Sequence, residues 1–176
     1  MMDQSFDAIY TQRTKLRPIT ESDVGVRYIG WFSDPEAVRF IESARSPQSI
    51  ESLRAFVRDR ADRPDVWFLG IFCRNDGGLI GTFKVEPIDT ELGVAVMGIL
   101  IGEAKWRGVG LAGEVIAAVA RELYVRLGIR HLDLGVHPDN ARAFRAYERI
   151  GFRTQSTSPR AIRMRLSTEG GADAAP

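Results

Sequence analysis

Apolar residues at helical spacing mark two helices in the second half of this sequence. The longer helix has an apolar residue at every fourth position and ends at Gly128, a typical helix C-cap; these positions are Leu111, Val115, Val119, Leu123 and Leu127. The second helix begins at Pro138-Asp139-Asn140 and stops at Gly151, with Phe144, Tyr147 and Ile150 on its apolar side. Both helices therefore present one face to a core.

The first third of the chain predicts two helices, with a short third between them. Thr20 and Asp23 form a weaker version of the capping box, and Asp34-Pro35 combines an N-cap residue with proline at the first helical position. Ser46-Pro47 repeats that signal before a helical apolar pattern that starts at Ile50. Residues 16–19, which precede Thr20, are predicted to be the end of a first strand.

Strands fill the remaining apolar segments, and these are Val66–Cys73, Leu79–Ile88, Glu91–Ile101, His131–Val136, Phe152–Thr154 and Ile162–Leu166. The segment Glu91–Ile101 is apolar along most of its length, as expected of a central strand covered on both faces. Gly93 and Gly98 interrupt it, and a glycine within a strand often marks a bulge or a close approach. The order predicts a mixed α/β (α+β) fold in one domain over residues 14–167, after an N-terminal extension (1–13) and before a disordered tail (168–176).

Composition narrows the function classes. A length of 176 residues suits one domain, and a net charge of +1 gives no general attraction to nucleic acid or to an anionic membrane. The single cysteine, Cys73, excludes an internal disulfide and a cysteine-built metal site, and no metal is expected. Because we find neither a signal peptide nor an apolar run near 18 residues, we expect a cytoplasmic protein.

The segment Arg107–Ala112, here called the glycine turn, carries the strongest chemical signal. Gly108 and Gly110 allow a tight bend and a close backbone approach by a ligand. The helix that begins at Leu111 directs its unpaired N–H groups and its positive dipole end at that ligand. A pyrophosphate is the anion that such a turn suits best.

Other glycine motifs account for this segment less well. The P-loop pattern is absent, because Glu114 stands where its lysine should be. Gly108, Gly110 and Gly113 match the dinucleotide fingerprint on paper, but they lie late in the chain, and the next strand ends without an acidic residue. An NAD-type oxidoreductase is therefore disfavoured, while a ligand-free tight turn stays open.

Two blocks of residues resemble the GNAT superfamily of acetyl-CoA-dependent N-acetyltransferases. Arg107, Gly110 and Ala112 match its R/Q-x-x-G-x-G/A signature, and a second block runs from Asn140 through Tyr147 to Gly151-Phe152. The opening segment TKLRPITESDV and the residues WFSDP are similar to the branch containing ribosomal-protein N-terminal and aminosugar acetyltransferases. The resemblance covers about residues 14–166. It implies a mixed, mostly antiparallel, twisted sheet of about six to seven strands flanked by helices.

The resemblance also implies a role for each matching residue. Tyr147 would protonate the departing thiolate as general acid, and the Asn140 side chain would hydrogen-bond the cofactor. The backbone of Ile99 and Ile101 would pair with the pantetheine arm of acetyl-CoA. Backbone N–H groups of the glycine turn would hold the CoA pyrophosphate, and these belong to Arg107, Gly108, Val109, Gly110, Leu111 and Ala112.

Simpler interpretations stand beside these roles. Asn140 is also a favoured helix N-cap, Tyr147 also suits a core, and the Arg107 side chain need do nothing at the surface. Cys73, placed mid-strand among large apolar residues, reads as a buried hydrophobe rather than a nucleophile.

The general base is open. Relatives in this branch often carry a glutamate two residues before the glycine that matches Gly98, and here that position is Val96. The acidic or basic groups nearby in sequence are Glu91, Glu103 and His137. A water chain, or an amine already deprotonated in solvent, would also serve.

The sequence thus predicts an N-acetyltransferase that moves an acetyl group from acetyl-CoA to an amine by direct attack in a ternary complex. We favour a small amine or an aminosugar nucleotide as acceptor, entering between Trp31 and the Pro47 segment. A protein N-terminus is one alternative, and a non-catalytic acyl-CoA-binding module, which Val96 favours, is another. Relatives are often homodimers, but no residue of this sequence requires a dimer.

Overall fold

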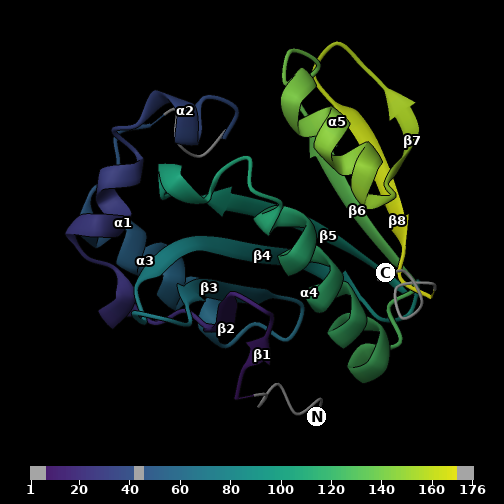
Figure 1. The fold of residues 1–176 in the computed structure, drawn as a ribbon. Coiled ribbons are helices and arrows are strands. Elements are labelled where there is room, and N and C mark those ends of the chain that lie inside the picture. Colours follow the sequence, from purple (N-terminus) through teal and green to yellow (C-terminus); the bar gives the residue numbers. More distant parts are fainter. Residues whose placement is uncertain (1–6, 42–45, 170–176) are drawn as a thin grey trace.

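A twisted sheet of eight strands runs through the computed structural model, which describes residues 7–41 and 46–169 (Figure 1). Its spatial order is β1-β2-β3-β4-β5-β6-β8-β7. The parallel pair is β5–β6, and all other neighbours are antiparallel. The strands are β1 (Ile9–Tyr10), β2 (Thr14–Pro18), β3 (Trp67–Cys73), β4 (Leu79–Asp89), β5 (Val94–Ile101), β6 (His131–Val136), β7 (Arg153–Thr157) and β8 (Ile162–Ser167). The predicted fold class is confirmed.

Helices cover both faces of the sheet. The helix α4 (Leu111–Leu127) packs with α5 (Ala141–Ile150) on one face. On the other face α1 (Val26–Trp31) and α3 (Ile50–Ala61) cover the half that contains β3, β4 and β5. Shorter helical segments are η1 (Glu21–Asp23), α2 (Pro35–Val38) and η3 (Ala104–Trp106). No helix of the described residues is long and apolar enough to cross a membrane.

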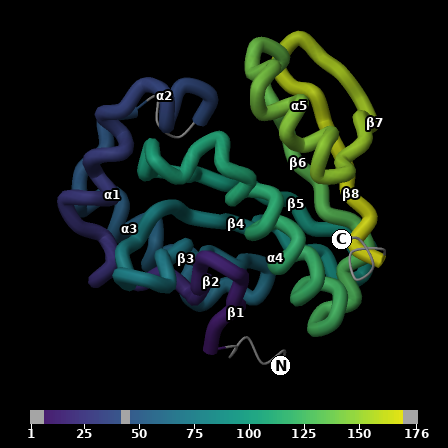
Figure 2. Tube along the Cα trace, viewed as in Figure 1, coloured from purple at the N-terminus to yellow at the C-terminus, as the bar shows by residue number. Residues whose placement is uncertain are grey.

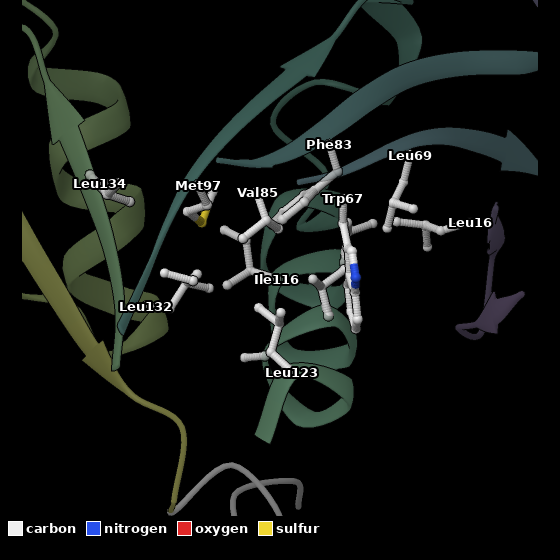
Figure 3. Close-up of a cluster of buried hydrophobic side chains, with 14 of the residues drawn as sticks. Leu16, Trp67, Leu69, Phe83, Val85, Met97, Ile116, Leu123, Leu132 and Leu134 are labelled. Atoms are coloured by element: carbon white, nitrogen blue, oxygen red, sulfur yellow. The ribbon is translucent and has the colours of Figure 1, made fainter. Parts of the chain in front are cut away.

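The predicted apolar stripe of α4 forms the centre of the larger core. Its side chains Leu111, Val115, Val119 and Leu123 are at most 1% exposed. Figure 3 shows Ile116 and Leu123 pointing toward the sheet residues Val85, Trp67 and Leu132. Full burial of such a side chain contributes about 1.5–3 kcal/mol to folding, so α4 is fixed firmly against the sheet.

The strands β5 and β6 pair along a short stretch and then separate. Their register holds for Val94 with His131, Ala95 with Leu132, and Val96 with Asp133. Beyond that point the two strands diverge, as Figure 2 shows. The last residues of β5 therefore pair with β4 but leave their other side without a strand partner.

Several predicted boundaries shift. The strand predicted from Glu91 begins at Val94, because Gly93 adopts a left-handed φ of 68° and ends a turn there. The cap of α3 is Ser49 rather than Ser46, and Ser49 forms a reciprocal capping box with Ser52.

The ends of the chain also contribute more than the sequence suggested. Ile9, assigned to an N-terminal extension, is buried in β1, and this short strand brings the sheet to eight strands rather than six to seven. Thr168 was assigned to a disordered tail, and for this residue the prediction is wrong. It is 4% exposed, and its Oγ1 donates a 2.6 Å hydrogen bond to the Ile129 carbonyl. The rest of that tail, from residue 170, lies outside the described residues.

Candidate active site

The glycine turn joins the end of β5 to α4, beyond the stretch where β5 pairs with β6. Gly108 and Gly110 have φ angles of 72° and 78°, in the left-handed region that other residues adopt only at a cost. Gly110 is the N-cap of α4, and it supplies no side chain to satisfy the helix N–H groups. The sequence requirement for glycine here is therefore conformational.

The backbone amides of this turn are available to a ligand. Within the described part of the chain, the N–H groups from Gly108 to Gly113 donate to no protein acceptor, and the next amide, that of Glu114, bonds to the Gly110 carbonyl. A carbon added at Gly110 would meet nothing within 4 Å. The N–H groups and the positive end of the α4 dipole thus face open space, which is the arrangement that binds phosphate groups.

The Arg107 side chain connects the glycine turn to the end of β5 and to the start of α2. Its Nε donates to the Ile101 carbonyl at 2.9 Å, and its Nη2 donates to the Gly102 carbonyl and to Asp34 Oδ2, the latter at 2.8 Å. Asp34 also caps α2, as predicted, through the Glu36 amide. The hydrogen bond from Arg107 is the main cause that lowers the pKa of Asp34. Arg107 is therefore a half-buried connector, not an idle surface arginine.

A second ion pair supports the turn from the β1–β2 connection. Arg13 donates from its backbone and its Nε to the two oxygens of Glu114, at 2.8 and 2.7 Å, and from Nη1 to the Val109 carbonyl at 3.0 Å. Burial opposes ionisation of Glu114, but hydrogen bonds from Thr11 and from Arg13 outweigh it and lower its pKa. Sequence reasoning missed Arg13, because 101 positions separate it from Glu114.

Ile99 and Ile101 turn their backbone groups toward the space between β5 and β6. The Gly102 amide donates to the Ile80 carbonyl in β4, and hydrogen bonding alternates along an antiparallel strand. The odd-numbered residues therefore face the other way, in line with Gly93, whose carbonyl accepts from the His131 amide. The Ile101 carbonyl accepts from Arg107, and its N–H group is available to a ligand.

Asn140 caps α5. Its Oδ1 accepts a 3.2 Å hydrogen bond from the Ala143 amide, so the N-cap interpretation is confirmed. In the described structure the Asn140 side-chain NH2 group makes no hydrogen bond to protein, which leaves it free to donate. The predicted contact to a cofactor and the observed cap are therefore compatible.

Tyr147 lies on the inner side of α5. Its ring packs edge-on against Phe152 with a centroid separation of 5.6 Å. Burial raises the pKa of Tyr147, so its hydroxyl stays protonated at neutral pH. No protein group in the described residues is hydrogen-bonded to that hydroxyl, and a proton-donating role is open to it.

The candidate bases occupy different places. Glu91 is exposed before the start of β5, whereas the glycine turn follows the end of that strand. Glu103 lies just past that end and accepts from the Trp31 indole N–H at 2.9 Å. His137 follows β6, contacts the Phe40 ring, and accepts at Nδ1 from the Asp139 amide, so its proton sits on Nε2 when it is neutral. Val96 is 37% exposed and offers no acid–base group.

Two further residues are structural. Trp31 is 4% exposed and lies against Gly102, where any side chain would overlap its ring, so it supports the end of β5 instead of lining an open entry. Cys73 is buried and unpaired in β3. Residues 42–45, which precede the Pro47 segment of the expected acceptor entry, lie outside the described residues.

The fold agrees with the comparison to known families. The model of the acetyltransferase (GNAT) domain matches residues 13–153, and this chain belongs to that family. It is 24% identical to the SPbeta prophage-derived uncharacterized N-acetyltransferase YokL of Bacillus subtilis (strain 168) over 119 residues. That match covers 68% of this chain and 66% of YokL, slightly less than two thirds of the relative.

Solved structures share the fold at low identity. One is RimL, a ribosomal alpha-N-protein acetyltransferase in complex with coenzyme A, at TM-score 0.77 and 18% identity, covering 91% of this chain and 97% of RimL. Another is the spermidine N-acetyltransferase of Vibrio cholerae in complex with CoA and spermine, at TM-score 0.76 and 17% identity, covering 91% and 98%. At these identities the likeness concerns the fold.

Proposed function

We propose that this chain transfers an acetyl group from acetyl-CoA to a primary amine. The observation that carries the proposal is the run of unpaired backbone amides from Gly108 to Gly113, at the positive end of a firmly packed helix. This run adjoins the gap between β5 and β6, where Ile99 and Ile101 offer backbone groups to an amide-rich chain such as pantetheine. Pyrophosphate and pantetheine are consecutive parts of CoA.

The residues around this gap account for the steps of acetyl transfer. A neutral amine attacks the thioester carbonyl, so that a C–N bond forms while the C–S bond breaks. In this proposal the N–H of Ile99, which faces the gap, stabilises the oxyanion that develops on the carbonyl oxygen. The Tyr147 hydroxyl, kept protonated by its raised pKa, gives its proton to the departing thiolate, and the proton that the nitrogen loses as the amide forms passes through water and restores the tyrosine.

Direct attack in a ternary complex fits the chain better than an acyl-enzyme. Its one thiol, Cys73, is 5% exposed and lies within β3. An acyl-enzyme on cysteine needs a thiol that the thioester can reach, and this thiol is buried. Both substrates must therefore be bound before transfer occurs.

We propose a small amine or an aminosugar nucleotide as the acceptor. The net charge of +1 provides no strong overall field to attract an anionic assembly such as the ribosome. The structural neighbours include both a polyamine acetyltransferase and a ribosomal-protein acetyltransferase, so the panel of acceptors must contain both classes. A protein N-terminus is the alternative.

The test is acetyl-CoA-dependent thiol release across a panel of polyamines, aminosugar nucleotides and N-terminal peptides, with the acetylated product identified by mass. We expect acetylation of at least one small amine, with initial-rate lines that intersect when both substrates are varied. Parallel lines would overturn direct attack, and acetylation restricted to peptides would favour the alternative acceptor.

A non-catalytic module makes a different prediction. Val96 in place of a glutamate is the feature that favours it. Calorimetric binding of CoA without turnover on any amine would support the module and overturn the enzyme. Absence of CoA binding would overturn both.

A further inference from the structure

Three arginines form a stripe along the outer side of α5. Arg142, Arg145 and Arg149 are exposed and spaced three and four residues apart, so they follow one side of the helix for about 10 Å at 1.5 Å per residue. They line a common surface depression of about 230 Å³. We refer to these three residues as the arginine stripe.

The charges of the stripe are not balanced within the protein. Across the described residues, none of the three forms an ion pair or a side-chain hydrogen bond, and Glu148, the acid on the same helix, pairs with none of them. Neighbouring like charges at these spacings destabilise a helix. Arg142 also lies in the first turn of α5, where the positive end of the dipole disfavours a cation. This arrangement favours the binding of an anion and does not stabilise the fold.

The stripe borders the glycine turn. A carbon added at Gly108 would lie 3.0 Å from Nη2 of Arg142, and one added at Gly113 would lie 3.4 Å from Ile150 at the other end of α5. The helix α5 therefore runs beside the first turn of α4, and Arg142 reaches the bend where the pyrophosphate is expected. Positive charge continues from the unpaired amides onto the arginine stripe.

We propose that the arginine stripe binds the 3′-phosphate of acetyl-CoA and makes the protein select CoA over its 3′-dephospho form. The inference rests on the proposed function, because it takes the ligand of the glycine turn to be CoA. On that molecule the 3′-phosphate is carried by the ribose next to the pyrophosphate, and it is a doubly charged group at neutral pH. Guanidinium groups bind such phosphates through paired, charge-assisted hydrogen bonds.

The test compares calorimetric dissociation constants for CoA and 3′-dephospho-CoA. We expect the unmodified chain to bind CoA at least roughly tenfold more tightly, the effect of one charge-assisted hydrogen bond. The double variant Arg142→Gln/Arg145→Gln should lose that preference by weakening the binding of CoA while leaving that of 3′-dephospho-CoA nearly unchanged. Its thermal midpoint should not fall, since neither arginine forms an ion pair or a side-chain hydrogen bond within the described residues.

The control removes the same charge elsewhere. Arg121 and Arg130 are exposed, and in the described structure neither makes an ion pair. The variant Arg121→Gln/Arg130→Gln should keep the full preference for CoA, which separates a local contact from a change in net charge.

The outcomes that overturn the inference are distinct from failure of the proposed function. Equal affinity of the unmodified chain for the two ligands, or an equal loss of both affinities in the stripe variant, would overturn the 3′-phosphate site. Either result together with acetyl transfer would leave the proposed function intact. Stripe variants whose affinities for both ligands are unaltered would likewise overturn the 3′-phosphate site, and absence of any CoA binding would overturn both proposals.

Discussion

Asp34 and Arg107 join the start of α2 to the glycine turn through a 2.8 Å contact between Oδ2 and Nη2. The same guanidinium group holds the carbonyls of Ile101 and Gly102 at the end of β5. One side chain thus fixes the strand end, the bend and the neighbouring helix relative to one another. The geometry of the proposed pyrophosphate site depends on this connection.

Arg107→Gln should therefore impair the reaction with acetyl-CoA more than it lowers the free energy of unfolding. Gln cannot reach three acceptors on two segments, so the bend relaxes, and misplacement on the scale of 1 Å costs up to roughly a hundredfold in rate. We expect initial-rate measurements to show that the KM for acetyl-CoA rises about tenfold or more, which lies within this hundredfold limit. Arg17→Gln removes a comparable ion pair, with Asp23, away from the turn, and it should leave this KM unchanged. Equal KM values for both variants would show that Arg107 is only a surface contact.

The two ends of α4 offer a matched pair of glycine substitutions. Gly110 and Gly128 both have left-handed φ angles, 78° and 67°, and a carbon added to either meets nothing within 4 Å. Gly110→Ala and Gly128→Ala should each cost roughly 1–2 kcal/mol of stability, the price of a left-handed residue with a side chain. Only Gly110→Ala should also raise the dissociation constant for CoA, because only Gly110 lies in the bend whose amides are proposed to hold the pyrophosphate. Similar CoA affinities in the two variants would contradict a pyrophosphate site at this bend.

Tyr147→Phe tests the general acid. The ring contact with Phe152 is retained, so the fold should be unaffected, while loss of the proton donor should lower kcat roughly a hundredfold. Burial raises the pKa of Tyr147, so its protonated form, and the activity that depends on it, should persist above pH 10.0, the ordinary tyrosine value. The measurement is a pH profile of kcat for both proteins. Unchanged turnover in Tyr147→Phe would remove the tyrosine from the mechanism.

The ion pair of Glu114 should make the stability of the folded protein fall in acid. Burial disfavours its charged form, but the hydrogen bonds from Thr11 and Arg13 dominate and lower its folded pKa below the ordinary 4.5. A lowered folded pKa means that the stabilisation is present above the unfolded value and is lost as pH falls through the folded value. Glu114→Gln should cost about 1 kcal/mol at pH 7, and the difference from the unmodified chain should vanish in stronger acid. Urea unfolding from pH 7 down to pH 3 measures it, and a constant difference would show that the charge is irrelevant.

Local signals explain which features the sequence predicted well. The helix α4 has a long periodic stripe and a glycine at each end, so both its bounds and its buried face could be derived from the sequence. The cap of α3 was misplaced because Ser46 and Ser49 are equally good caps, and only packing decides between them. The strand β1 has two residues, too few for any periodicity.

The contacts that hold the site in place could not be predicted from such local signals. Arg107 and Asp34 are 73 positions apart, and Arg13 and Glu114 are 101 apart, so no spacing rule connects them. The residue at which β5 and β6 stop pairing is a property of the whole sheet, and no local sequence signal marks it. The motif residues were found from their chemistry, whereas the contacts that hold them required three dimensions.

The short pairing of β5 with β6 has a consequence for how the molecule exchanges its backbone protons with solvent. In the free protein the N–H groups of Ile99 and Ile101 face no neighbouring strand and should exchange with deuterium quickly for residues so near the core. A bound thioester that occupies the gap would act as the missing strand between the two parts of the sheet. Slow exchange at these two amides would then signal saturation with the acyl donor, whether or not any acceptor is known.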